Sequence, residues 1–510
     1  MRKLLIILAL CCLIGNAMAA DTLMNPKRID LSKNWSGQMH NVTNGSSDQD
    51  VATYSQLISA KNGDGALVGF SSDCMFQITT TFGADAAIQA ASDWLYAKNG
   101  GGVVTLEAGM YNFSTSDRID LASRGVVLRG ASNMFLKQSA FYWNVAASNT
   151  TKPIGTIFRV FGTTNSPINI DADSITIENI AFWYPTQATN ATPTAYAPSI
   201  SIGESTQCND AIVRGCNFYN SYIGIKGYST SQKVYVSECS GSPIMSGIQY
   251  YAWLGNCPII EKCHFYNGYD YRIGSVLGNW TADNGVAIDL YDFDGGIIEG
   301  CVAAGYDVGI RLAGTSVTGN STDSPQISKC YIVGKWPLMI SNAYRPSVSW
   351  CTLGAWDFYR SAVYPGDAIV LTNALDADIS HNGIYSVGRK VLHVADSRNM
   401  RFSGNTIQGW DFNHGNLQLM TFDNECPGFQ IVDNIFNGSL ASAYCRGIYV
   451  GTNDNWQVCD NRFEGLITYS LYIESGAANF RAADNTWPTT ANIIDGSGSV
   501  NKNVTDNLVY

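Results

Sequence analysis

The sequence has few charged residues, only five histidines and no long apolar run after its first twenty residues. Charged residues make up 14% of the 510 residues, and 31 basic against 42 acidic side chains give a net charge of −11. No basic run occurs, so we expect no nucleic-acid partner, because proteins bind phosphate backbones with clustered Lys and Arg. We expect no membrane partner either, since a spanning helix needs roughly 18 consecutive apolar residues.

Several motifs that carry chemistry are also absent. The chain has no Asp-Asp pair, no Gly-x-Ser-x-Gly nucleophile motif, no phosphate-binding loop and no Cys/His spacing typical of metal ligands. We therefore expect no resident metal and no other cofactor.

The first 19 residues have the pattern of a secretory signal peptide. Arg2 and Lys3 precede an apolar run over residues 4–14, and Ala17-Met18-Ala19 supplies a small-x-small cleavage site. The run is too short to span a membrane. We expect cleavage after Ala19 and secretion to the periplasm or the extracellular space. Cleavage removes two basic residues and no acid, which leaves 29 against 42 and a net charge of −13.

A short repeat organises the chain from about residue 200 onward. Alternating apolar residues are followed by Cys or Asn and then by another apolar residue, as in Ile212-Val213-Arg214-Gly215-Cys216. The Cys or Asn positions are Cys216, Cys239, Cys263, Cys301, Cys330, Cys351, Asn382, Asn405, Asn434, Asn461 and Asn485. The ten intervals between these eleven positions cover 269 residues, about 27 residues each. A short period with variable insertions is typical of a solenoid, and alternation with period two indicates strands.

The repeated Cys and Asn form a column in which equivalent residues of successive coils stack. Asn there suits either a left-handed turn or a ladder of amide hydrogen bonds. Six of the twelve cysteines left after cleavage lie in the column, where a small buried apolar residue fits, so we expect buried thiols. A bridge among Cys426, Cys445 and Cys459 stays open.

The residues before the repeat predict a helix followed by strands. Residues 84–95 have helical periodicity, and strands are expected at 103–106, 111–113 and 126–130. Such a helix would protect the first strand edge of the stack. We expect three segments: a signal peptide at 1–19, a loose flank at 20–81, and one repeat domain at 82–510.

The segment from Phe82 to Gly130 resembles the opening of the pectin lyase-like superfamily, especially its polygalacturonase-related branch. The resemblance rests on Ala-Ile-Gln-Ala at 87–90, Gly-Gly-Val-Val at 101–104 and Ala-Gly-Met-Tyr at 108–111. It implies an all-β fold, a single-stranded right-handed parallel β-helix of about eleven to thirteen coils with a short N-terminal capping helix, either a monomer or a homotrimer. The superfamily includes hydrolases, lyases, epimerases and phage tailspikes, so the fold alone implies no mechanism. The Asn-Thr-Asp, Gly-His-Gly and Arg-Ile-Lys signatures of polygalacturonases are absent.

A second column suggests chemistry. Five to seven residues after the Cys/Asn column, an acid or a base recurs, in most coils beside an aromatic residue. The members are Tyr269-Asp270, Tyr306-Asp307, Lys335-Trp336, Trp356-Asp357, Arg389 and Trp410-Asp411. Such similar offsets are expected to place these side chains on one face, about 5 Å apart per coil. The alternative is a structural role, in which Asp occurs because it favours turns and the aromatic residues stack on one another between coils.

We take the carboxylates of this column as candidate catalytic groups, because glycoside hydrolysis uses two carboxyl groups, one to donate a proton and one to activate water or attack. The candidate catalytic residues are Asp270, Asp307 and Asp357. The candidate substrate-binding residues are Tyr306, Arg311, Trp336, Trp356, Arg389, Trp410 and Asp411.

Two insertions and one histidine offer further possibilities. Asp289, Asp292 and Asp294 form either a solvated acidic loop or a set of oxygen ligands for calcium. Arg360 suits an ion pair with Asp357. His393 with Asp396 is a candidate acid/base pair.

Three functional classes follow. The first is a glycoside hydrolase that degrades a polysaccharide with two carboxylates of the column. The second is a lyase or epimerase acting on a uronic-acid polymer, with Lys335, Arg311 or Arg389 as base and calcium as a possible cofactor. The third is a carbohydrate-binding or surface protein without catalysis. A polysaccharide is the expected partner in all three.

Overall fold

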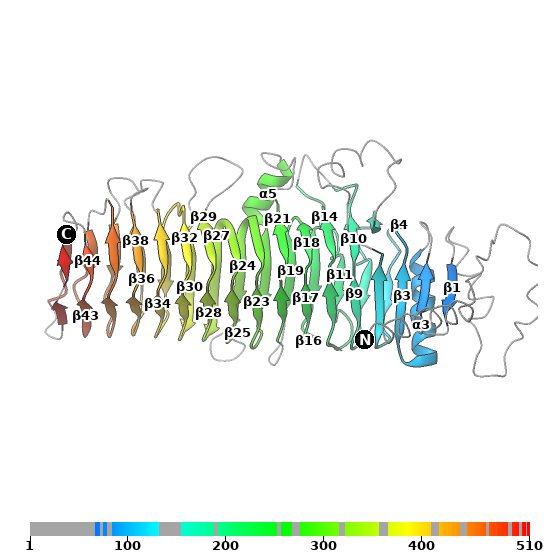
Figure 1. Ribbon diagram of the computed structural model, residues 1–510, viewed down its shortest axis with the longest axis horizontal. Helices are drawn as coiled ribbons and strands as arrows, with labels where there is room; N and C mark the ends of the chain where they lie inside the picture. Colours follow the sequence, from blue (N-terminus) through cyan, green and yellow to red (C-terminus); the bar gives the residue numbers. More distant parts are fainter. Residues whose placement is uncertain are drawn as a thin grey trace, which may run out of the picture.

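The computed structural model describes most of the chain after residue 66. The described residues are 67–71, 75–78, 84–131, 155–187, 192–251, 257–267, 276–315, 322–355, 366–409, 418–438, 446–465, 469–487, 492–498, 502–505 and 507–509. They form one elongated stack of coils, with the blue N-terminal strands at one end and the red C-terminal strands at the other (Figure 1). The predicted signal peptide lies outside the described residues.

Each coil supplies up to three short strands, one to each of three faces, which we call the first, second and third face in chain order. In one coil these are β13 (Ile212–Arg214), β14 (Asn217–Tyr219) and β15 (Ile223–Gly227). In the next they are β17 (Tyr235–Ser237), β18 (Ser240–Ser242) and β19 (Ser246–Tyr251). Each strand pairs in parallel with its equivalent in the next coil, so successive coils stack in register.

The first face is a continuous sheet that precedes the Cys/Asn column. Its other strands are β1 (Leu67–Ser71), β2 (Met75–Ile78), β3 (Gly102–Leu106), β6 (Val126–Gly130), β9 (Thr176–Glu178), β20 (Ile259–Glu261), β23 (Ile297–Glu299), β26 (Gln326–Ser328), β28 (Ser347–Ser349), β31 (Asp378–Ser380), β34 (Arg401–Ser403), β37 (Gln430–Val432), β40 (Gln457–Cys459), β43 (Phe480–Ala483) and β46 (Lys502–Thr505). Among the described residues only β1 pairs antiparallel. This sheet has 17 strands, more rungs than the eleven to thirteen coils expected, because the N-terminal coils lack the Cys/Asn signal.

The second face follows the column. Its other strands are β4 (Gly109–Phe113), β7 (Thr156–Val160), β10 (Ile180–Trp183), β21 (His264–Tyr266), the first parts of β24 (Val302–Ala313) and β27 (Tyr331–Tyr344), β29 (Thr352–Ala355), β32 (Gly383–Tyr385), β35 (Thr406–Gln408), β38 (Ile435–Asn437), β41 (Arg462–Glu464), β44 (Thr486–Trp487) and β47 (Leu508–Val509).

The third face closes each coil. Its other strands are β5 (Ile119–Leu121), β8 (Ile168–Ile170), β11 (Ile200–Ile202), β22 (Val286–Tyr291), the second parts of β24 and β27, β30 (Ile369–Leu375), β33 (Leu392–Ala395), β36 (Gln418–Asp423), β39 (Arg446–Val450), β42 (Tyr469–Ile473) and β45 (Asn492–Asp495). The remaining short strands are β12 (Cys208–Asn209), β16 (Ser231–Gln232) and β25 (Thr322–Asp323).

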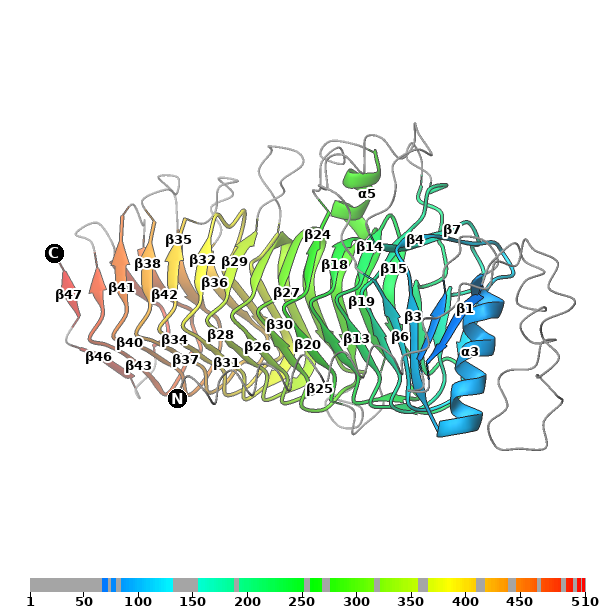
Figure 2. The same cartoon turned by 45° about the vertical axis from the view of Figure 1, so that its right-hand side comes forward.

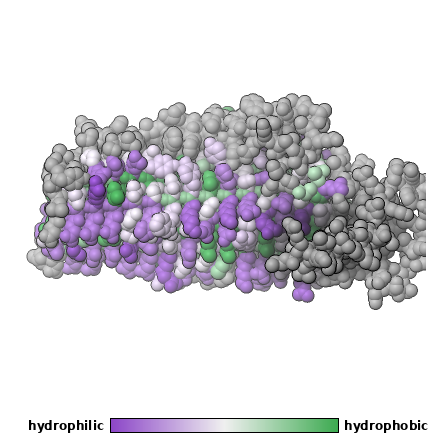
Figure 3. All heavy atoms as spheres, viewed as in Figure 1, coloured by the Kyte–Doolittle hydropathy of each residue, from purple (hydrophilic) through white to green (hydrophobic). Residues whose placement is uncertain are grey.

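The core fills the inside of the coils. On the first face the buried residues Val213, Val236, Ile260, Ile298 and Ile327 stack in adjoining coils. Alternate residues of each strand point outward, and on the face seen in Figure 3 hydrophilic residues cover most of the described surface. The alternation in the sequence thus separates a dry interior from a polar exterior.

The Cys/Asn column is buried, and its asparagines form the amide ladder. Asn382 Nδ2 donates to Asn405 Oδ1 at 3.0 Å, and Asn405 Nδ2 to Asn434 Oδ1 at 3.0 Å. The left-handed position is the residue before the column, as at His381 with φ 57°. The left-handed alternative for these asparagines is therefore wrong.

The column cysteines are buried free thiols, as expected. The thiol of Cys239, for example, donates to the Val213 carbonyl of the preceding coil at 3.7 Å. Cys426 and Cys459 are also free thiols and so are not bridged to each other, whereas Cys445 lies outside the described residues.

The predicted N-terminal helix is present as α3 (Ala84–Asn99), which buries Ile88 and Leu95 in the core. Figure 2 shows α3 beside the N-terminal strands. Strand β2 falls within the expected flank at 20–81 yet pairs in parallel with β3, so the sheet begins before residue 82. Neither α3 nor the short helix α5 (Val276–Asn284) is long and apolar enough to cross a membrane.

The corner between the second and third faces carries two of the insertions. Residues 267–285, including α5, interrupt the coil of β21 and β22, and residues 356–368 interrupt the coil of β29 and β30. Between them β24 and β27 run through the corner as continuous strands. These two coils therefore present their corner residues without an insertion of their own.

Candidate functional site

The uninterrupted corner brings together two residues of the predicted charged column. In the pairing of β24 with β27, Tyr306 aligns with Gly334 and Val308 with Trp336, so Asp307 and Lys335 occupy neighbouring positions. Lys335 Nζ lies 3.3 Å from Asp307 Oδ1. Asp307 lies six residues after Cys301 and Lys335 five residues after Cys330, and the register shift between Ala304 and Tyr306 brings the two side chains side by side.

The Asp307 carboxyl group is only 23% exposed. Burial raises its pKa above the ordinary value for aspartate, and the negative charge of Asp283 on α5 adds to this effect. The positive charges of Lys335 and Arg311 oppose it but do not cancel it. A carboxyl group with a raised pKa keeps its proton to higher pH, which is the property of a general acid.

Arg311 is held by a buried acid. Its Nε and one terminal nitrogen each donate to Asp289 at 2.7 Å, and Asp289 is buried. The guanidinium also lies 5.3 Å from the centre of the Tyr291 ring. Arg311 is therefore half-buried and positioned by Asp289, and it acts on Asp307 through its charge.

The acidic insertion does not assemble as a calcium site. Asp289 is committed to Arg311, and Asp292 Oδ1 accepts from the Thr315 backbone nitrogen at 2.7 Å. Across the described part of the chain, no group of three or more His, Cys, Asp or Glu side chains gathers as ligands of a metal ion.

The expected sugar contact of Tyr306 is wrong. Its side chain is 1% exposed, and its hydroxyl donates to the Pro243 carbonyl at 2.7 Å. The pairing register shifts between Ala304 and Tyr306, a bulge at which Tyr306 becomes part of the core. Its neighbour Trp336 is half-buried and stays a candidate for substrate contact.

Five predicted site residues lie outside the described residues. They are Asp270, Trp356, Asp357, Trp410 and Asp411. The expected Asp357–Arg360 ion pair lies there too.

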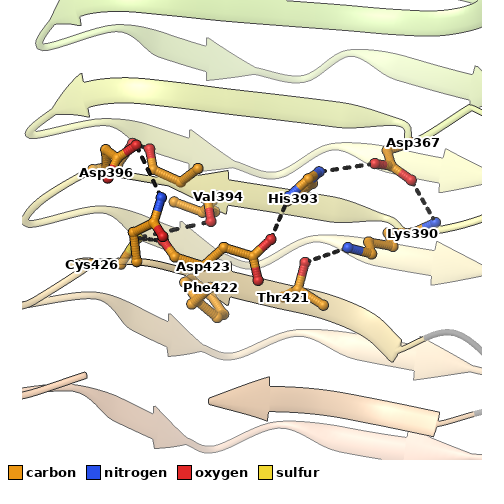
Figure 4. Close-up of polar contacts among 12 residues, drawn as sticks. Asp367, Lys390, His393, Val394, Asp396, Thr421, Phe422, Asp423 and Cys426 are labelled. Atoms are coloured by element: carbon orange, nitrogen blue, oxygen red, sulfur yellow. Dashed lines mark hydrogen bonds and ion pairs between the residues drawn. The ribbon is translucent and has the colours of Figure 1, made fainter. Parts of the chain in front are cut away.

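A second polar cluster lies two to four coils beyond β24, around His393 on β33 (Figure 4). His393 Nδ1 is 3.1 Å from Asp367 Oδ2, and His393 Nε2 is 2.8 Å from Asp423 Oδ2. Asp367 is 1% exposed, whereas Asp423 is 46% exposed. The hydrogen bond with Asp367 raises the pKa of His393, so the ring is a cation held between two carboxylates over a widened pH range.

The expected pairing of His393 with Asp396 is wrong. Asp396 has a φ of 51°, a left-handed turn conformation directly after β33, and its carboxylate accepts from Asn424 Nδ2 at 3.2 Å. His393 instead reaches carboxylates in the coils before and after its own.

Basic groups surround the buried Asp367. The Lys390 backbone nitrogen donates to Asp367 Oδ1 at 3.2 Å, and Arg389 Nε lies 3.7 Å from the same oxygen. Lys390 Nζ donates to Thr421 Oγ1 at 2.8 Å, and burial lowers the pKa of Lys390. Asp367 is thus compensated by several donors, as a buried charge requires.

Sequence reasoning considered Arg389 and His393 but missed Lys390 and Asp423 and left Asp367 without a role. The pairs His393–Asp367 and His393–Asp423 are separated by 26 and 30 residues, close to one repeat. Alignment of the third strands, where Val370, His393 and Thr421 share a register position, is the signal that finds the cluster.

No protein-family profile matches the chain, and no curated protein matches it. A mutant tailspike protein of E. coli bacteriophage HK620, solved in complex with a pentasaccharide, is similar in structure: 11% identity, 82% of this chain and 76% of that chain covered, TM-score 0.50. The A-module of mannuronan C-5 epimerase AlgE4 from Azotobacter vinelandii also matches, at 13% identity, 84% and 95% coverage and a TM-score of 0.37. A mutant DFA-IIIase from Arthrobacter chlorophenolicus A6, in complex with DFA-III, matches at 10% identity, 87% and 97% coverage and a TM-score of 0.37.

At these identities the likeness concerns the fold alone. The parallel pairing of successive coils and the match to the tailspike agree with the resemblance at residues 82–130. The chain folds as a right-handed parallel β-helix.

Proposed function

We propose that this protein is a secreted enzyme that hydrolyses a polysaccharide at the corner formed by β24 and β27, with Asp307 as the proton donor. The raised pKa of the half-buried Asp307 carries the proposal. Protonated Asp307 gives its proton to the glycosidic oxygen as the bond to the departing sugar breaks. Secretion rests on the predicted signal peptide at 1–19.

Glycoside hydrolysis needs a second carboxylate. Asp283 on α5 is close enough for its charge to raise the pKa of Asp307, and it is exposed. Two carboxyl groups in different environments can divide the roles, the buried one as acid and the solvated one as base or nucleophile. Asp283 therefore joins Asp270 and Asp357 as a candidate for the second role.

Lys335 has a role after Asp307 has given up its proton. Its ammonium contacts Asp307 Oδ1, and it stabilises the carboxylate that Asp307 becomes after it gives up its proton. Burial keeps the pKa of Asp307 raised despite this contact, so the proton remains available for the first step.

The fold supports a carbohydrate ligand. The tailspike that matches with a TM-score of 0.50 was solved with a bound pentasaccharide. A stack of coils offers equivalent groups about 4.8 Å apart, a regular spacing that suits a repeating polymer.

The test is a product screen of residues 20–510 on neutral, uronic and sulfated polysaccharides. Each reaction is followed by reducing ends and by ultraviolet absorbance, with and without a calcium chelator. We expect new reducing ends without ultraviolet absorbance, and their loss in Asp307→Asn. Binding without products would instead indicate a carbohydrate-binding protein.

A second candidate is β-elimination or epimerisation of a uronic-acid polymer. The lowered pKa of Lys390, beside Arg389 and His393, favours it, because these reactions need a base and a cation near the sugar carboxylate. Products that absorb in the ultraviolet would select elimination. Loss of activity in Lys390→Met but not in Asp307→Asn would select this cluster.

A further inference from the structure

A second surface that suits sugars lies on the third face, beyond the corner. Its aromatic column follows from strand register: His393 aligns with Thr421, Thr421 with Tyr449, and Tyr449 with Tyr472. Beside it, Phe422, Val450 and Ile473 are also aligned. The next residues, Asp423, Gly451 and Glu474, therefore form a parallel polar column. We call Asp423, Gly451, Glu474, Tyr449 and Tyr472 the third-face patch.

Each of the two carboxylates of the patch has one oxygen bound by a neighbouring side chain and one oxygen left for a ligand. Asp423 Oδ2 contacts His393 Nε2 at 2.8 Å, and Glu474 Oε2 accepts from the Tyr449 hydroxyl at 2.6 Å. Within the described residues, the other oxygen of each carboxylate has no hydrogen-bond partner. Each acid thus keeps one fixed acceptor for a ligand hydroxyl.

Gly451 leaves space between these acids. A Cβ there would lie 3.3 Å from the Phe422 carbonyl oxygen, 3.7 Å from Glu474 Oε2 and 3.8 Å from Asn453 Nδ2, so a longer side chain would crowd these groups. Asp423 and Glu474 are two coils apart, roughly 10 Å along the stack. Because residue 451 is glycine, no side chain of the intervening coil stands at this position between Asp423 and Glu474.

Two aromatic rings lie in the adjoining column of the patch. The rings of Tyr449 and Tyr472 are nearly parallel, with 5.6 Å between centroids and 14° between planes, and both are half-buried. Aromatic side chains with a polar end suit a ligand that presents both C–H groups and hydroxyls.

Contacts with the neighbouring coil also preorganise the patch. Asp423 is fixed by His393, which is fixed in turn by the buried Asp367 (Figure 4). Binding groups that are already ordered lose less entropy when a ligand binds. His393 is therefore a positioning residue that acts through Asp423.

We propose that the third-face patch is a binding subsite for a neutral sugar unit. The free oxygens of Asp423 and Glu474 accept hydrogen bonds from its hydroxyls, and the two tyrosines contact its ring. A uronic acid is disfavoured, because its carboxylate would face two like charges. The subsite rests on the proposed function only in that the ligand is a polysaccharide, since β36 lies four coils, roughly 19 Å, from β24 and takes no part in bond cleavage.

The experiment is native affinity electrophoresis of the full mature chain through gels containing galactomannan, xyloglucan, dextran or soluble starch, with polygalacturonate and alginate as anionic comparisons. We expect at least one neutral polymer to retard the protein. Glu474→Gln and Tyr472→Ala should each raise the apparent Kd about tenfold, the loss typical of a charge-assisted hydrogen bond or a buried aromatic contact. Tyr472→Phe keeps the ring and should bind nearly as the wild type.

The matched control is Asp396→Asn, which removes a nearby acid outside the patch at a left-handed position that Asn tolerates. It should bind as the wild type, and circular dichroism should show that all variants are folded. Unchanged retardation in both Glu474→Gln and Tyr472→Ala, retardation by anionic polymers only, or no retardation at all would overturn the proposal.

The Asp307→Asn background separates this proposal from the proposed function. Loss of hydrolysis with retained binding, followed by loss of binding in Asp307→Asn/Glu474→Gln, supports both. Hydrolysis that needs Asp307 with patch variants that bind normally overturns only the subsite. Binding that needs Glu474 in a protein whose turnover ignores Asp307 supports the subsite and overturns only the proposed function.

Discussion

Lys335 places its ammonium group 3.3 Å from the carboxylate of Asp307, yet the pKa of Asp307 remains raised. An exposed carboxylate beside a lysine would have a lowered pKa, so the loss of water around Asp307 outweighs the attraction of the nearby charge. This balance is what makes Asp307 suitable as an acid, and it leads to two predictions about turnover.

The first concerns the proton itself. Asp307→Asn keeps the shape of the side chain but cannot donate the acid proton, so we expect kcat to fall about 100- to 10,000-fold. The measurement is initial rate on the best substrate of the product screen. Asp376→Asn serves as the control, because Asp376 has a left-handed backbone conformation that Asn tolerates. Wild-type turnover in Asp307→Asn would contradict the assignment. Asp283→Asn and Asp357→Asn, made alongside, identify the second carboxylate by the same loss.

The second concerns the pH profile. An acid catalyst works in its protonated form, so activity falls as pH rises through its pKa. The charge of Lys335 lowers the pKa of Asp307, and Lys335→Met removes that effect. We therefore expect the basic limb of kcat/KM to move to higher pH in Lys335→Met. A limb that stays in place, or moves to lower pH, would show that another group titrates there.

The third concerns stability around His393. Its pKa is raised in the folded protein, chiefly by the hydrogen bond with Asp367 and further by Asp423, whereas burial and the charge of Lys390 oppose the increase. A raised folded pKa stabilises the protein fully below the unfolded value of about 6.5, and this contribution is lost as pH rises through the folded pKa. The free energy of unfolding should thus decrease across that interval, and the decrease should be smaller in His393→Gln. Urea denaturation at a series of pH values measures both, and equal slopes for the two proteins would exclude His393 as the source.

The sequence predicts the repeat well because the alternation of apolar and polar residues marks which side chains are buried. The Cys/Asn column and the alternation around it anticipate the stacked strands, the buried thiols and the capping helix. The pairing of Asp307 with Lys335 follows only in part, because their offsets from the column differ by one residue and a bulge in β24 brings them into register.

What the sequence hides is whatever depends on local departures from the repeat. A bulge places Tyr306 in the core, although its neighbour in the chain, Asp307, faces the corner. His393 bonds across coils to Asp367 and Asp423 and not along the chain to Asp396, and only the register of the third-face strands shows this. Asp283 is part of the candidate site because α5 lies at the corner, and the repeat pattern of the sequence does not predict this position.

The last prediction tests the ladder that holds the C-terminal coils together. Asn405 is fully buried, donates to the Ile379 carbonyl and to Asn434, and accepts from Asn382. Asn405→Ala removes these bonds and leaves buried neighbours without partners, so we expect a loss of about 2–4 kcal/mol in the free energy of unfolding.

Cys351→Asn is the matched comparison, at the column position directly before the N-terminal end of the ladder. The Cys351 backbone nitrogen already donates to Asn382 Oδ1 at 2.8 Å, the arrangement that Asn382 makes with Asn405. An asparagine at 351 would extend the ladder by one coil, so its effect should stay within about 1 kcal/mol of the wild type. Urea denaturation of both variants decides the matter. Equal losses would mean that the column tolerates no change of side chain at all, whereas a large loss in Asn405→Ala alone shows that the amide hydrogen bonds, and not mere volume, stabilise these coils.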